Sequence, residues 1–341
     1  MPDMFKHIAP QLIVVAIFTC LSSLSVFSKE LDGGVSAYSF MNIPTSSIIY
    51  GLGGVNISTV DADDVGTTDQ NPSLLGPEFG SQIQLNYMRW LGSGNFAGLK
   101  GCSAAGEHGA WGASLQYFGY GSIPNTDATG TILGEYSPSD ISFSAIYSHD
   151  LFSRLRGGFA IKAIFSQYGD YSAMAIGADL GLNYYDIERE LSLSLVVSSL
   201  GGQLKRFQNA YEKLPTDVRI GLTKLLGESP ILLNITAWNM TKWQLPVVSS
   251  KTDKTFFANL MRHLVVGLEV VPSKKFNFAV GYNYNTRAEM ATYSRNILSG
   301  ISVAGGIKLN AFGFNLALAQ PHAGATSLMI NFTTNIYDLT H

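Results

Sequence analysis

A two-residue alternation of side-chain type constrains this chain more than any other feature. It is clearest over 276–285, where apolar or aromatic residues occupy the even positions and small or polar residues the odd positions. Successive side chains of a β-strand point to opposite faces, so this stretch predicts a strand with one apolar and one polar face. A helix of the same sequence would distribute both classes around its axis.

The alternation recurs along most of the chain after residue 81. By the usual strand and hairpin signals it predicts about fourteen strands. They lie near 82–90, 94–102, 110–119, 139–148, 157–167, 172–185, 190–199, 216–224, 230–238, 263–271, 275–284, 300–309, 311–320 and 326–336.

The connections between these strands sort by length. The longest ones all have odd numbers in chain order, whereas the even-numbered ones are uniformly brief; the long set is 120–138, 200–215, 239–262 and 285–299. Long loops at one end and tight turns at the other are typical of outer-membrane barrels. A soluble sandwich gives no reason for such sorting. The predicted fold is therefore all-β: a closed antiparallel transmembrane β-barrel of about fourteen strands, spanning 81–341, in a bacterial outer membrane.

The composition is consistent with strands that face lipid. Charged residues make up 14% of the chain, compared with roughly 25% in soluble domains. Glycine, tyrosine and phenylalanine are abundant, with 35, 16 and 19 residues. A Gly-rich soluble β-protein is not excluded by composition alone. The net charge of −3 provides no basic surface for phosphates, which argues against nucleic acid as a partner.

The N-terminus has the pattern of an export signal. Lys6 and His7 precede an uncharged run that is most apolar over 12–21, and small residues follow at Val26 and Ser28. This pattern predicts a signal peptide over 1–28. A retained membrane anchor is disfavoured because the apolar run is short and is interrupted by serines.

Residues 29–80 lack the alternation and are rich in turn signals, with prolines at Pro44, Pro72 and Pro77. A barrel of fourteen strands encloses a lumen too wide for wall side chains to fill. The segment is therefore predicted to be a hatch, or plug, made of short helices. Its acidic residues Asp61, Asp63 and Asp64 do not complete an EF-hand ligand set, and we expect them in a solvated turn.

Several stretches resemble the FadL-like outer-membrane family. The triplet Asn71-Pro72-Ser73 is similar to the Asn-Pro-Ala motif of that family's N-terminal hatch. Further similarity, to the PorQ-like and PorV-like barrels of the type IX secretion system, lies in 38–46, 52–58, 70–75, 85–88, 177–181 and 200–205. The resemblance implies an outer-membrane component of an attachment complex. Its implied partners are a PorZ-like surface protein, PorU, PorV and outer-membrane lipopolysaccharide.

No catalytic constellation or metal-ligand spacing is visible, so we expect neither an enzyme nor a cofactor. The preferred hypothesis is a docking barrel whose long loops contact a partner. Their aromatic residues are candidate anchors: Phe207, Tyr211, Trp243, Phe256, Phe257 and Tyr293. These aromatics could instead pack over the barrel mouth or join the membrane girdle.

Two other functions compete with docking. One is a FadL-like transporter of hydrophobic small molecules, and the other is a structural porin. The expected inward positions are mostly small or polar, with Lys100, Lys162 and Lys308 as exceptions. A polar lumen counts against an apolar cargo.

Overall fold

The structure is a computed structural model. It describes residues 38–59, 63–90, 93–126, 129–207, 211–245, 255–273, 275–289, 298–309, 311–322 and 325–336. The predicted signal peptide lies outside these ranges. No helix within them is long and apolar enough to cross a membrane.

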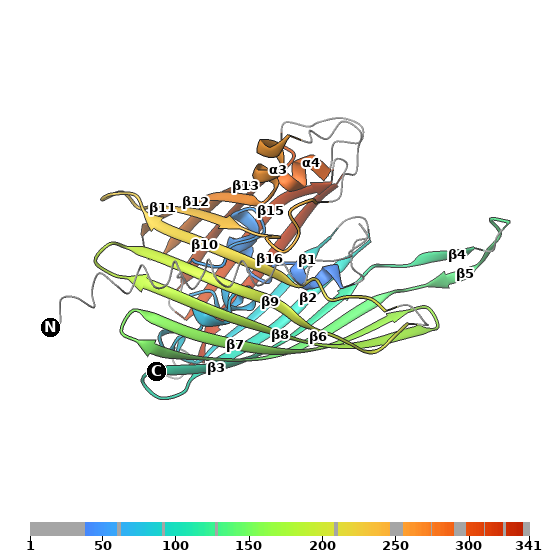
Figure 1. The fold of residues 1–341 in the computed structure, drawn as a ribbon, viewed down its shortest axis with the longest axis horizontal. Helices are drawn as coiled ribbons and strands as arrows, with labels where there is room; N and C mark the ends of the chain where they lie inside the picture. The colour runs from blue at the N-terminus through green and yellow to red at the C-terminus, as the bar shows by residue number, and fades with distance from the viewer. Residues whose placement is uncertain are drawn as a thin grey trace.

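Fourteen antiparallel strands form a closed barrel (Figure 1). They are β1 (Gln82–Arg89), β2 (Asn95–Ala104), β3 (Gly109–Gly119), β6 (Ser139–Phe152), β7 (Leu155–Tyr168), β8 (Tyr171–Asp186), β9 (Leu191–Lys205), β10 (Asp217–Leu225), β11 (Ile231–Ala237), β12 (Leu264–Ser273), β13 (Phe276–Asn283), β14 (Ile301–Leu309), β15 (Phe312–His322) and β16 (Ala325–Asn335). The prediction of a closed antiparallel barrel of about fourteen strands is confirmed.

The first and last strands close the barrel. β1 pairs with β16 along its whole length, with Leu85 opposite Phe332. No sheet edge is left unpaired in the barrel, which is what a sheet in hydrocarbon requires, because each unpaired backbone group there costs several kcal/mol. The outward side chains are largely apolar and exposed, as Phe143 and Phe278 illustrate. This exterior is that of a bacterial outer-membrane barrel.

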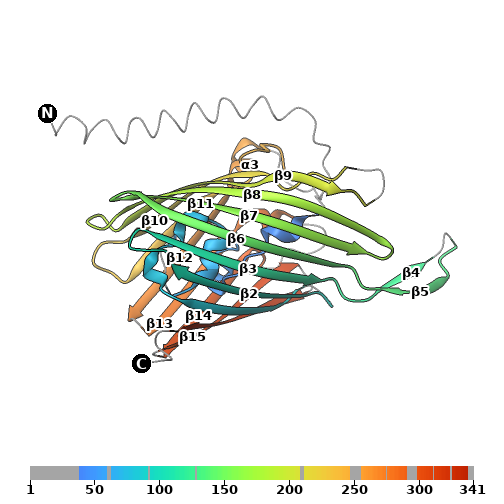
Figure 2. The ribbon, with the colours of Figure 1, turned by 90° about the horizontal axis from the view of Figure 1, so that it is seen from below.

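The long connections gather at one end of the barrel, as the parity of the loops predicts. They carry the hairpin of β4 (Ile123–Thr126) and β5 (Ile132–Tyr136), helix α3 (Phe256–Arg262) and helix α4 (Tyr284–Glu289). The hairpin projects well beyond the barrel in both views (Figures 1 and 2). This hairpin was not predicted, because both of its strands are exposed on both faces and so show no alternation.

Residues 38–59 and 63–80, here called the inner segment, lie inside the barrel (Figure 2). Its helices are short: η1 (Ser39–Asn42), α2 (Ser47–Gly51), η2 (Val65–Asp69), η3 (Pro72–Leu74) and η4 (Pro77–Phe79). Side-chain caps explain where three of them begin, since Ser46, Asp64 and Asn71 each accept a backbone N–H of the following turn. Proline at the first position of η3 and η4 presets the helical φ angle.

Candidate functional site: a filled lumen with an aromatic mouth

The middle of the lumen is lined by a continuous polar row. Strand register places eight inward residues side by side: Asn277, Gly306, Asn315, Asn331, Asn86, Gly98, Gln116 and Ser142. The predicted polar lumen is found at this level.

An apolar row lies one inward position closer to the long loops. It consists of Ala279, Ala304, Ala317, Met329, Met88, Phe96 and Phe118, and it ends at Asp140. All seven apolar residues are buried. Over these strands the lumen changes from polar to small or apolar within two residues. Polar side chains return toward the mouth, where Asp217 and Arg219 of β10 and Asn283 of β13 are all buried.

The inner segment is bound to the wall on most sides. Hydrogen bonds or ion pairs reach it from β1, β2, β3, β6, β7, β9, β10, β11, β12, β13, β14 and β16. Buried polar groups need hydrogen-bond partners. These contacts provide them, because polar groups of the inner segment bind polar groups of the lumen wall.

A buried ion pair is the centre of this network. Asp69 of the inner segment meets Lys100 of β2 with 2.6 Å between Oδ1 and Nζ. Thr45, Ser114 and Gln116 also donate hydrogen bonds to the Asp69 carboxylate. Lys100 was expected as an unusual inward lysine, and its partner explains how the charge is accommodated in the lumen. Lys162 is likewise paired, with Asp179.

The acidic residues of the inner segment do not share one environment. Asp64 is fully buried and accepts hydrogen bonds from Ser46, Gln84 and the Gly66 backbone. Burial raises the pKa of the Asp64 carboxyl, and these hydrogen bonds oppose the shift. The expected solvated turn is thus wrong for Asp64. It holds for Asp63, which is exposed and pairs with Lys308, and Asp61 lies outside the described residues.

The Asn71-Pro72-Ser73 triplet is a structural anchor. The Asn71 side chain accepts hydrogen bonds from the Ser73 backbone N–H and hydroxyl and donates to the carbonyl of Ile57. The triplet packs on β6, β7 and β8. Two wall glycines make room for it, since a Cβ at Gly158 would overlap the Pro72 backbone and one at Gly181 would overlap the Asn71 side chain. This contact could not be predicted, because both glycines lie far from the triplet along the chain.

The loop aromatics divide into two groups at the long-loop end. Phe207 stacks on Tyr168, with 5.0 Å between ring centroids. Trp243 stacks on His263 at 5.1 Å and contacts Phe256 at 5.4 Å. Phe207, Trp243 and Phe256 therefore each contact an aromatic ring of the same chain.

Phe256, although it contacts Trp243, is among the most accessible of the described candidates, together with Phe257 and Tyr211. Phe256 and Phe257 on α3 are 70% and 67% exposed, so most of both rings faces solvent. Tyr211 is also exposed, with the Arg206 guanidinium over its ring. Tyr293 lies outside the described residues.

A cavity of about 370 Å³ lies at the mouth, between the inner segment and the wall. Six aromatic residues line it, Phe40, Tyr50, Trp90, Phe118, Tyr120 and Trp238, together with polar residues that include Asn42, Asn283 and Glu289. Burial raises the pKa of Tyr50 to about 12, so it remains a neutral phenol. Such a lining suits an apolar or aromatic molecule. Among the described residues, no group of three His, Cys, Asp or Glu side chains could hold a metal ion.

Comparison with solved structures places the fold among outer-membrane channels. The Pseudomonas putida toluene transporter TodX matches with a TM-score of 0.54 and 13% identity, covering 85% of this chain and 97% of that one. The CymD monoaromatic hydrocarbon channel matches with a TM-score of 0.52 and 9% identity, covering 88% and 99%. A Pseudomonas aeruginosa FadL homologue has a TM-score of 0.45 at 11% identity, covering 85% and 97%. No protein-family model and no curated protein matches the chain.

Proposed function

We propose that this barrel is closed by its inner segment, which acts as a hatch, and anchors a PorZ-like surface protein in a type IX attachment complex with PorU and PorV. The observation that carries the proposal is the filled lumen. A segment bound to most strands of the wall, with a buried ion pair at Asp69 and Lys100, favours a static barrel. The accessible working surface is then the long-loop end, near lipopolysaccharide.

Exposed apolar side chains at that end support a protein partner. They include Phe256 and Phe257 on α3, and Ile132 and Leu133 on the projecting hairpin. Aromatic side chains are common energetic anchors of protein interfaces. Helix α3 holds its two phenylalanines in place, since Thr255 caps its N-terminus and Arg262 donates a hydrogen bond to Asn285 of α4.

The test is a pull-down from detergent-solubilised outer membrane, with partners identified by mass. We expect a surface protein to copurify with the wild-type chain and to be lost from a Phe256→Ser/Phe257→Ser variant. The matched control is Phe152→Ser, an equally exposed aromatic residue at the short-turn end. Equal recovery of the partner with both variants would show that α3 is not the contact.

The mouth cavity favours a second candidate, a channel for small apolar molecules. Its six aromatic residues and the apolar row beneath it suit such a cargo, and the fold is shared with the toluene transporter TodX and the monoaromatic hydrocarbon channel CymD. Trp90 and Trp238 line the cavity and provide a fluorescence signal. Binding of toluene should quench it in the wild type and less in a Phe118→Asn variant. Transport further requires uptake that is lost with the gene and restored with it.

A further inference from the structure

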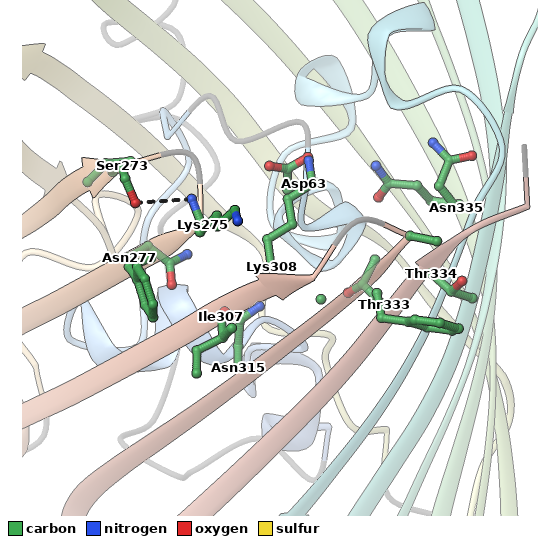
Figure 3. A pocket seen from close by; sticks show the side chains of 16 residues that line it. Asp63, Ser273, Lys275, Asn277, Ile307, Lys308, Asn315, Thr333, Thr334 and Asn335 are labelled. Carbon is green, nitrogen blue, oxygen red and sulfur yellow. Dashed lines mark hydrogen bonds and ion pairs between the residues drawn. The ribbon is translucent and has the colours of Figure 1, made fainter. Parts of the chain in front are cut away.

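A second cavity, of about 380 Å³, opens at the short-turn end of the barrel. Figure 3 shows it from close by, with Asp63, Lys275 and Lys308 among the side chains that line it. It is lined by the ends of β12 to β16 and by Asp63 of the inner segment. Neither docking at the loops nor binding at the mouth uses this cavity.

Two lysines face each other across this cavity's rim. The Lys308 backbone N–H donates to the Lys275 carbonyl at 2.9 Å, which continues the pairing of Phe276 with Ile307 and sets the lysines directly opposite. Like charges at directly opposed positions are destabilising. In the described part of the chain, Asp63 pairs with Lys308 and no ion pair is formed by Lys275. The site therefore carries one uncompensated positive charge in a chain of net charge −3.

The same inward row continues to a buried hydroxyl. Register places Lys308 beside Gly313 and Gly313 beside Thr333. Gly313 leaves a gap, since a Cβ there would find only ordinary contacts. Thr333 is 4% exposed, lines the cavity, and its Oγ1 has no hydrogen-bond partner.

A second polar group without a partner lies one row further in. The Oδ1 atom of Asn277 is buried and makes no hydrogen bond. It faces Asn315 above Gly306, where a Cβ would overlap the Oδ1 atoms of both asparagines. Buried polar atoms seldom lack a hydrogen-bond partner, so an unpaired one that lines a cavity indicates a group able to bind a polar ligand. The Oδ1 atom of Asn277 can only accept a hydrogen bond, and a hydroxyl group on a ligand would supply the donor.

We propose that this cavity binds a phosphate group that bears hydroxyl substituents, as in a glycerol phosphate. Lys275 supplies the uncompensated positive charge for the phosphate, which lies over Gly313, and Lys308, which also pairs with Asp63, is a second ammonium donor. Thr333 and Asn277 bond the oxygens and hydroxyls of the ligand. Lysine ammonium groups bind phosphate as point charges with several donors.

Two sources present this chemistry, an anionic lipid headgroup and a soluble glycerol phosphate. The neighbouring outward residues favour the lipid. Phe276, Ile307 and Phe312 also line the cavity and are exposed on the apolar exterior, where acyl chains would lie.

Native mass spectrometry of the full-length protein released from detergent tests the site, with phosphatidylglycerol and phosphatidylcholine as probes. We expect phosphatidylglycerol to be retained preferentially, and a Lys275→Gln/Lys308→Gln variant to lose about tenfold in affinity, since charge-assisted hydrogen bonds are strong. The control is Lys224→Gln, which removes an exposed lysine from the same end but on β10. Heat-modified migration on a gel verifies that each variant is folded. Equal retention of both lipids, or unchanged binding by the double variant, would overturn the proposal.

The Thr333→Val variant distinguishes an effect on lipid binding from an effect on the stability of the protein. Replacing a buried hydroxyl without a partner by a methyl group should raise the unfolding temperature of the free protein while weakening phosphatidylglycerol binding about threefold. Unchanged lipid binding by this variant would contradict the assigned role of Thr333. Glycerol 3-phosphate distinguishes the sources: if it binds alone with the same dependence on the lysines and phosphatidylglycerol does not, the lipid assignment is wrong and the ligand is soluble.

Discussion

Asp69 and Lys100 form a salt bridge inside the barrel, with 2.6 Å between Oδ1 and Nζ and side-chain exposures of 8% and 4%. One partner comes from the inner segment and the other from β2. Their contact therefore reports directly on whether the segment is seated.

Removing one partner of this pair should be strongly destabilising. Asp69→Ala leaves the Lys100 ammonium buried without a counter-charge, which costs about 3–5 kcal/mol. Chemical denaturation in detergent measures the change. The double variant Asp69→Asn/Lys100→Met should recover much of the loss because it removes both charges. As a control, Asp63→Asn breaks an exposed pair with Lys308 and should change stability by about 1 kcal/mol or less. Equal stability of Asp69→Ala and wild type would contradict a seated segment.

The filled lumen should conduct almost no ions. We expect the wild-type barrel to show negligible conductance in planar bilayers, since the inner segment occupies the space that fourteen strands enclose. Deleting residues 38–80 should produce large, stable conductance steps if the barrel folds without them. If the wild-type protein conducts ions as well as the deletion variant does, the protein is a structural porin.

Asp64 should make stability depend on pH. Burial raises the pKa of the Asp64 carboxyl in the folded protein, whereas in the unfolded chain this pKa is about 4. Between these values the folded state binds more protons, so the free energy of unfolding falls as pH rises through the folded pKa. Asp64→Asn preserves the accepting oxygen and can donate to Ser46, and it removes this dependence. The variant should therefore gain stability relative to wild type toward neutral pH. Parallel pH profiles of the two proteins would refute the assignment.

The glycines beneath the Asn71-Pro72-Ser73 triplet should tolerate no side chain. A Cβ at Gly158 would overlap the backbone of Pro72 and Ser73, so Gly158→Ala should cost about 1–3 kcal/mol. Thermal unfolding in detergent measures it. Gly101→Ala is the matched control, because a Cβ there meets nothing closer than 3.9 Å. Similar effects of both substitutions would mean that the triplet is not packed against β7.

The strand pattern could be predicted because alternation is local. The expected strand over 157–167, for example, is observed at Leu155–Tyr168. The apolar row was not predicted because each strand contributes one residue to it, and only register brings Met88, Phe96 and Phe118 together. The burial of Asp64 was missed for a similar reason, since its partners Ser46 and Gln84 are 18 and 20 residues away.

The pairing of β1 with β16 has a consequence for biogenesis. The ring closes where β16 meets β1, and residues 38–59 and 63–80 lie within its circumference. A wall that forms around this segment encloses it at the moment of closure. Later replacement of that segment would require the seam between the two terminal strands to part.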